Sequence, residues 1–129
     1  MNIDDLLKIA IERDASDLHL KAGNHPTIRV HGTLVPLVGF PKLTSSDTEE
    51  LANQILSDFQ RKKLKEEFDI DLAYSLPGFG RFRGNVFYQR NSLTVALRII
   101  PLEVKSIREL LLPEILEKIA FSPRGLVLV

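Results

Sequence analysis

Four arginines between residues 81 and 98 are the side chains of this sequence best suited to bind a charged ligand. A guanidinium group is a planar fork of N–H donors that can bind two oxygens of one phosphate or carboxylate at once. Apolar and polar residues alternate on both sides of Arg90-Asn91, which predicts that strands 81–89 and 92–100 pair around a two-residue turn. The candidate ligand-binding residues are Arg81, Arg83, Arg90 and Arg98.

The register of this predicted hairpin determines which arginines meet. If Gln89 faces Ser92, one face collects the apolar side chains, and a slip of one residue would mix the two faces. On the polar face Arg83 then lies directly opposite Arg98, with Arg81 diagonal to them and Arg90 at the tip. Like charges that face each other destabilise a sheet by a few tenths of a kcal/mol, and an anion between them would reverse the sign.

Two other readings of the arginine face stay open from the pattern alone. Clusters of charge on a sheet are most often solvated, so the long side chains of Arg83 and Arg98 would simply diverge into water. They would alternatively pair with Asp69 and Asp71 on a neighbouring strand.

Composition narrows the classes of function. The 129 residues include 17 basic and 17 acidic side chains, so the chain has no net positive field to attract nucleic acid or an anionic membrane. Cysteine is absent, which excludes a disulfide framework, a thiolate metal site and a cysteine nucleophile. The three histidines match no metal-ligand spacing. Because no targeting segment or membrane-spanning apolar run is visible, we expect a soluble cytoplasmic protein.

The elements before the hairpin begin with an amphipathic helix, since apolar residues recur at helical spacing from Ile3 to Ala10. Three short strands follow at residues 14–21, 27–31 and 34–37. A capping sequence at Thr44 or Ser46 then predicts a helix. Its expected buried stripe consists of Leu51, Ala52, Ile55, Leu56 and Phe59, and a shorter helical piece pairs Leu64 with Phe68.

The second half of the chain reverts to a period of two. Strand 69–76 precedes the hairpin, Pro101 ends the sheet, and Ser106 with Glu109 has the spacing of a capping box. Residues 113–120 are expected to form a helix with Ile115, Leu116 and Ile119 inward, and residues 126–129 a strand. Blocks of strands separated by helices predict an α+β fold with a largely antiparallel sheet.

Six motifs in order along the chain resemble the secretion-ATPase superfamily, whose members drive type II secretion and type IV pili. They are Ala15–Leu20, Pro26–Val30, Gly80–Phe87, Gln89-Arg90, Arg98–Pro101 and Pro123–Val129. The first motif begins near residue 15, which is more similar to the pilus-retraction ATPases than to the pilus-extension or type II secretion ATPases.

The resemblance implies a division of the chain. Residues 1–101 would be a PAS-like N-terminal domain, residues 102–122 a linker and helix, and residues 123–129 the first strand of a RecA-like ATPase domain. In that family six chains form a ring and ATP lies between the two domains. Because no phosphate-binding loop is present here, these residues alone would hold no catalytic residue and no cofactor, whereas the whole protein would use ATP and Mg²⁺.

The resemblance also assigns the arginines. By motif position Arg83, Arg98, Arg90 and, less directly, Arg81 would reach the ATP phosphates. The implied partners are the RecA-like domains of the same and neighbouring subunits in a homohexamer, together with the pilus platform protein of the inner membrane. Nucleic acid is not among them, and the protein would be held through its partners at the inner face of the cytoplasmic membrane.

Alternatives to this role remain. The chain would otherwise be the N-terminal domain of an extension or type II secretion ATPase, or a stand-alone PAS-like module for ligand binding or docking. One departure from the family pattern concerns Arg90, because Asn91 stands where glycine is common after the tip arginine. Asparagine tolerates a positive φ, so the turn should survive, but the substitution bears on the direction in which Arg90 points.

Overall fold

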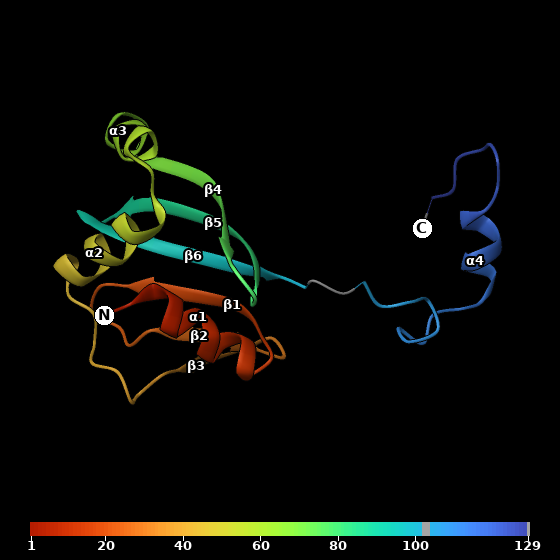
Figure 1. Ribbon diagram of the computed structural model, residues 1–129, viewed down its shortest axis with the longest axis horizontal. Helices are drawn as coiled ribbons and strands as arrows, with labels where there is room; N and C mark the ends of the chain where they lie inside the picture. The colour runs from red at the N-terminus through yellow and green to blue at the C-terminus, as the bar shows by residue number, and fades with distance from the viewer. Residues whose placement is uncertain (102–103, 129) are drawn as a thin grey trace.

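The computed structural model describes residues 1–101 and 104–128 (Figure 1). The elements in chain order are α1 (Ile3–Glu12), β1 (Ala15–Lys21), β2 (Thr27–Val30), β3 (Thr33–Pro36), α2 (Ser45–Ile55), α3 (Asp58–Glu67), β4 (Asp69–Leu76), β5 (Gly80–Gln89), β6 (Ser92–Ile100) and α4 (Ile115–Ala120).

The six strands form one sheet in the order β3-β2-β1-β6-β5-β4 (Figure 1). Every pairing between neighbours is antiparallel. The sheet therefore consists of two three-stranded meanders, one from each half of the chain, which join along β1 and β6. The expected α+β fold with an antiparallel sheet is confirmed.

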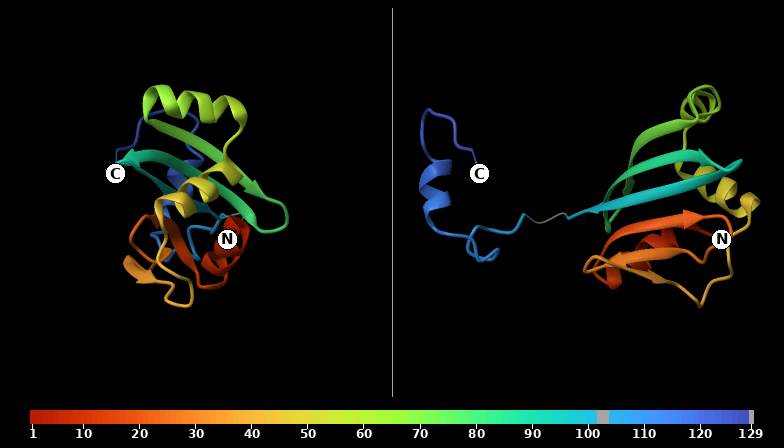
Figure 2. Two further views of the ribbon diagram at one scale, coloured as in Figure 1. Left: turned by 90° about the vertical axis from the view of Figure 1, so that its left-hand side faces the viewer. Right: turned by 180° about the vertical axis from the view of Figure 1, so that it is seen from behind.

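Helices cover one face of this sheet. α1 and α2 lie across it, and α3 lies beside the edge strand β4 (Figure 1). The sheet is seen from the other side on the right of Figure 2, where none of the described helices crosses it. Alternation along each strand sends apolar side chains to the covered face and polar ones to the open face. The core includes the fully buried Leu6, Leu7, Leu18, Leu20, Ile28, Phe82, Val86, Val95 and Leu97.

The helical region after β3 differs from the sequence prediction. A capping box at Thr44 and Asp47 starts α2 as expected, but α2 ends at Ile55. Ser57 then opens a second capping box, and the new helix points Phe59 outward, where it is 75% exposed. The prediction that Phe59 belongs to the buried stripe is wrong for this reason. Phe68 ends α3 in the left-handed conformation and packs edge-on against the ring of Tyr88 instead of joining the core.

Residues 110–128 lie apart from the sheet (Figures 1 and 2). Ser106 and Glu109 exchange the hydrogen bonds of a capping box, yet turns follow, and α4 begins only at Ile115. The side chain of Ile115 is exposed, not inward as expected, because no described element packs against it.

The strand expected at residues 126–129 is not formed at 126–128, which are irregular and exposed, since no described strand lies beside them to pair. Val129 lies outside the described residues, and the proposed domain boundaries stay predictions. In the part of the chain that the structure describes, no helix has the length and apolar character needed to cross a membrane.

Candidate anion-binding site

The β5–β6 hairpin has the predicted register. Gln89 faces Ser92, and Arg83 faces Arg98. The turn residues Arg90 and Asn91 have φ values of 49° and 61°, the conformation that a two-residue hairpin turn of this hand requires. The register places Arg83 and Arg98 side by side on the open face of the sheet.

The two arginines continue into a row that crosses four strands. Arg29 of β2 faces Asp17 of β1, Asp17 faces Arg98 of β6, and Arg98 faces Arg83 of β5. We call these four residues the arginine row. The charges along it read plus, minus, plus, plus, so the single carboxylate leaves two positive charges uncompensated within the row.

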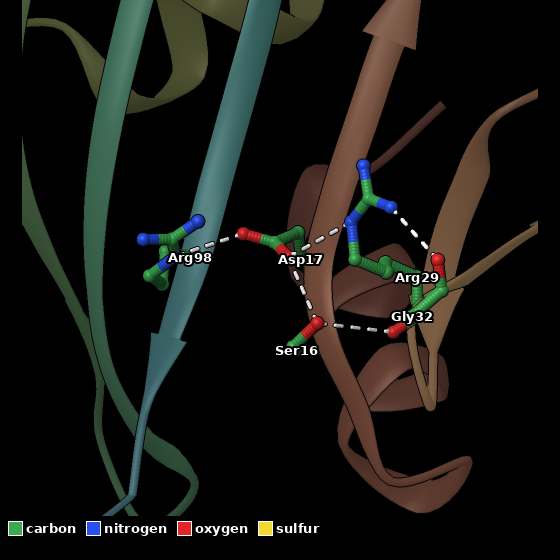
Figure 3. Close-up of polar contacts among 5 residues, drawn as sticks. All are labelled: Ser16, Asp17, Arg29, Gly32 and Arg98. Carbon is green, nitrogen blue, oxygen red and sulfur yellow. Dashed lines mark hydrogen bonds and ion pairs between the residues drawn. The ribbon is translucent and has the colours of Figure 1, made fainter.

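Asp17 binds in three directions at once (Figure 3). Its Oδ1 accepts a hydrogen bond from Nε of Arg98 at 2.9 Å, and its Oδ2 accepts one from the Ser16 hydroxyl at 2.8 Å. Nε of Arg29 lies 3.4 Å from the same Oδ2, and Nη1 of Arg29 donates to the carbonyl of Gly32. Asp17 is almost buried, with 7% of its surface exposed, and both of its carboxylate oxygens have partners.

The pKa values beside the row follow from this geometry. Burial alone would raise the pKa of Asp17, but the hydrogen bonds from Ser16 and Arg98 and the positive charges outweigh it, so its pKa lies below the ordinary value. Burial lowers the pKa of His19, and the charges of Arg29 and Arg98 add to this effect while Asp17 opposes it. We therefore expect an ionised Asp17 and a neutral His19 at pH 7.

A shallow hollow of about 240 Å³ lies over the positive end of the row. Arg83 and Arg98 line it from neighbouring strands, and both are exposed. Arg83 forms no ion pair with the described residues, and the hydrogen bonds that Arg98 makes to them come from Nε alone. Terminal guanidinium nitrogens thus remain free for a ligand. The other lining residues are Asp17, His19, Asp71, Gly84, Asn85, Ala96 and Leu97.

The other two predicted arginines, Arg81 and Arg90, lie at different distances from the hollow. Arg81 lies two residues before Arg83 on the same face, opposite Ile100, so it is a neighbour of the hollow. Arg90 lies at the hairpin tip, seven residues beyond Arg83, which corresponds to about 23 Å along an extended strand. Within this chain Arg90 therefore cannot share a ligand with Arg83 and Arg98, and its contact with nucleotide stays a separate prediction.

The alternative in which the arginines pair with Asp69 and Asp71 is wrong for the described residues. The amide nitrogen of Asn85 donates to Asp69 at 2.8 Å and to Asp71 at 3.2 Å. The acid that pairs with Arg98 is Asp17 instead of Asp69 or Asp71. The sequence pattern did not predict this pair, because it does not show that β1 lies beside β6. The available signal was an acid on the side of the strand opposite the buried Leu18 and Leu20.

The two guanidinium groups make the hollow suited to an anion more than to a cation. Arginine stays protonated and cannot act as a general base, and Asp17 is occupied by its three partners. Among the residues at 1–101 and 104–128, no group of three histidine, aspartate or glutamate side chains is arranged to hold a metal ion.

Comparison with known proteins gives no matching family model but several relatives along the chain. The type IV pilus ATPase PilU of Pseudomonas aeruginosa is 38% identical over 128 residues, which cover 99% of this chain and 33% of PilU. The pilus retraction ATPase PilT of the same organism is 39% identical over 129 residues, covering 100% of this chain and 37% of PilT. A twitching motility protein of Neisseria gonorrhoeae is 36% identical over 104 residues, 81% of this chain and 28% of that protein.

Solved structures agree with these relatives. The crystal structure of the pilus retraction motor PilT with bound ADP matches with a TM-score of 0.82 and 41% identity, covering 95% of this chain and 36% of that one. The ATPase DotB of Legionella pneumophila shares the fold, with a TM-score of 0.66 and 24% identity over 94% of this chain and 34% of DotB.

This chain spans about one third of the length of the relatives that it matches. Within that third the similarity runs through both meanders of the sheet and through the hairpin that carries Arg83 and Arg98. By sequence and by fold, the chain corresponds to the N-terminal region of the PilT-like pilus ATPases.

Proposed function

We propose that this chain is the N-terminal domain of a hexameric motor ATPase that powers type IV pilus retraction. In this proposal Arg83 and Arg98 contact the phosphates of ATP, which is bound mainly by a RecA-like domain of the same or a neighbouring subunit. The observation that carries the proposal is the pair of facing arginines in an exposed hollow with free terminal nitrogens. The relatives named as pilus ATPases and the PilT structure with bound ADP support the choice of nucleotide.

Phosphate fits the donor set of this site better than other common ligands do. Two adjacent guanidinium groups can bind several phosphate oxygens bidentately, and the anion would relieve the repulsion between Arg83 and Arg98. Mg²⁺ does not fit, because the two side chains that dominate the hollow are cations and the carboxylate of Asp17 is already engaged. Mg²⁺ would therefore belong to the ATPase domain.

The role of the arginines would be electrostatic. Negative charge builds up on the transferring phosphoryl group and the leaving phosphate, and an arginine fixed nearby stabilises that charge. Neither arginine can act as a general base, because a guanidinium group stays protonated. We infer that residues 1–129 close over the nucleotide and do not hydrolyse it by themselves.

The remaining parts of the proposal concern the whole protein. Its RecA-like domains would be the direct partners of this face within a homohexamer. A platform protein of the inner membrane would connect the motor to the pilus, which would hold an otherwise cytoplasmic protein at the membrane. No nucleic acid partner is proposed, since basic and acidic side chains balance at 17 each.

The test is ATP turnover by the complete ATPase chain that contains these residues. Replacing Arg83 or Arg98 with Ala should slow turnover at least about tenfold, since arginines supplied to phosphoryl transfer contribute roughly 10³- to 10⁵-fold where one residue does the work. Lys at either position should restore only part of the rate, because a point charge lacks the bidentate fork.

Arg61→Ala is the matched control. Arg61 lies on α3, where it pairs with Asp58 and donates to the carbonyl of Asn53, and it does not line the hollow. Ring formation is checked by light scattering for every variant. If both Ala variants at Arg83 and Arg98 keep the parental turnover while forming rings, the arginines are a solvated sheet face and the proposal fails.

A further inference from the structure

Asp17 belongs to the arginine row, but the proposed function gives it no role. It lies on β1, which belongs to the opposite meander from Arg83 and Arg98. It is also the only acid in the row, and it hydrogen-bonds to one of the two arginines that face the hollow but not to the other. This asymmetry indicates that the two arginines are held in different ways.

The point of attachment on Arg98 matters for what Arg98 can bind. Asp17 accepts from Nε, the nitrogen nearest the chain, at 2.9 Å. The terminal pair, Nη1 and Nη2, forms no hydrogen bond with the described residues, and the Arg98 side chain is 72% exposed. An arginine anchored by Nε keeps its terminal N–H groups available for a second anion. The anchor also restricts the rotamers of the long side chain before the ligand binds.

The anchor itself is rigid. Both oxygens of Asp17 are engaged, Oδ1 by Arg98 and Oδ2 by Ser16 and Arg29, and only 9% of its side chain is exposed to competing water. Its position on β1 is fixed by pairing on both sides, with Arg29 of β2 and Arg98 of β6. A carboxylate held in this way can orient a partner more firmly than a solvated ion pair can.

The anchor also offsets a repulsion. Arg98 has Arg83 directly across one strand boundary and Asp17 directly across the other. Without the carboxylate, the two guanidinium groups would be driven apart across the hollow. With it, Arg98 stays beside Arg83, so that both can address one phosphate group.

We propose that Asp17 is a positioning residue, which holds Arg98 by Nε so that its terminal nitrogens point, together with Arg83, at one phosphate of the bound nucleotide. This inference rests on the proposed function for the identity of the ligand. The anchoring of Arg98 by Asp17 can nevertheless be measured in the 129-residue chain without any nucleotide.

The first experiment uses this chain labelled with ¹³C and ¹⁵N. The Nε–H signal of Arg98, assigned by its loss in Arg98→Lys, is followed by NMR during acid titration together with the carboxyl signal of Asp17. The inference expects the Arg98 signal to follow the Asp17 titration curve and the Arg83 signal to respond much less. An Arg98 signal that does not change while Asp17 titrates would overturn the inference, and this measurement needs no variant at Asp17.

The second experiment compares Asp17→Asn with Asp71→Asn in the complete ATPase chain. Both variants remove one carboxylate from the same hollow, but Asp71 is bonded to Asn85 and not to Arg98. We expect Asp17→Asn to lower kcat roughly three- to tenfold with KM unchanged or lower, because the site becomes more positive while Arg98 loses its orientation. Asp71→Asn removes the same charge but no bond to Arg98, so it should lower kcat by less than Asp17→Asn does.

The outcomes separate the two proposals. If Arg98→Ala slows turnover but Asp17→Asn does not, the arginine contact stands and the positioning role is wrong. If neither Arg98→Ala nor Arg83→Ala slows turnover, the proposed function fails, whatever the NMR titration shows about the anchor. If Asp17→Asn and Asp71→Asn lower kcat equally, the effect is one of local charge and the positioning role is again wrong.

Discussion

Arg98 is bonded to Asp17 at 2.9 Å, whereas Arg83, which faces Arg98 on the next strand, has no ion pair among the described residues. Two arginines that look equivalent in the hairpin pattern therefore differ in what they contribute to the folded state. Arg98 is bonded to a buried carboxylate, and Arg83 extends freely from the sheet.

This difference predicts unequal stability for the two alanine variants. Arg83→Ala removes a repelling charge and should change the free energy of unfolding by less than about 0.5 kcal/mol. Arg98→Ala leaves the almost buried Asp17 with fewer partners and should cost about 1 kcal/mol. Urea denaturation of the 129-residue chain measures both, and equal stabilities would show that the Asp17–Arg98 bond contributes nothing to the fold.

Gly84 gives a second prediction, because it is buried in β5 between two leucines. A Cβ at this position would lie 2.7 Å from Cδ2 of Leu97 and 3.2 Å from Cγ of Leu72. Leu97 is only 1% exposed and has little room to move aside. Gly84→Ala should therefore destabilise the chain by about 1–3 kcal/mol in urea denaturation, as overpacked cores generally do.

Gly80, at the start of the same strand, is the control for this experiment. A Cβ there would meet no atom within 4 Å, so Gly80→Ala should stay within about 0.5 kcal/mol of the parent. The double variant Gly84→Ala with Leu97→Ala should cost less than the sum of the single changes, because the smaller side chain makes room for the new methyl group. Full additivity would contradict the proposed clash.

The pH dependence of stability should reveal His19. Its pKa is lowered in the folded state by burial, so the unfolded chain takes up the proton first as the pH falls below about 6.5. Folding stability should therefore be complete above that pH and decline on acidification. Asp17, whose pKa is also lowered, adds a second loss that begins near its ordinary value of about 4.

Unfolding free energies from urea titrations between pH 7.5 and 5.5 test the contribution of His19. In His19→Gln the decline over this range should be shallower than in the parent. A His19→Gln variant that keeps the parental slope would rule out the half-buried neutral histidine.

The 129 residues alone should not turn over ATP and should bind it only weakly. Their sequence contains no Gly-Lys-Ser/Thr loop, so no lysine and no ring of backbone amides can hold the β- and γ-phosphates. Isothermal calorimetry with ATP and Mg²⁺ should detect no binding in the micromolar range. Micromolar affinity would mean that the arginine row is a nucleotide site in its own right.

The hairpin could be predicted from sequence because its information is local. A strict period of two on both sides of Arg90-Asn91 leaves one register that separates apolar from polar residues, and that register is observed. The same reasoning located the facing arginines. The break between α2 and α3 has a local sequence signal, since Ser57 and Gln60 have the spacing of a capping box. The sequence prediction missed the break because apolar residues continue at helical spacing from Leu51 to Phe59.

The partner of Arg98 could not be predicted, for a physical reason. Which strands become neighbours depends on how the two meanders pack, and periodicity within one strand carries no such information. Asp17 could be assigned to the polar face of β1, but its contact with Arg98 required the pairing of β1 with β6. Likewise, residues 126–128 have the composition of a strand and yet form none, because a strand requires a neighbour.

The pairing of β1 with β6 has a consequence for how this part of the chain folds during its synthesis. Asp17 and Arg98 are 81 positions apart, so a chain leaving the ribosome can form its first meander early but must leave one edge of β1 open until β6 has been synthesised. Closing so long a loop makes this junction a late and slow event in folding. Because the arginine row spans the junction, the anion site comes into existence only when the last strand docks, and an unfinished chain presents none.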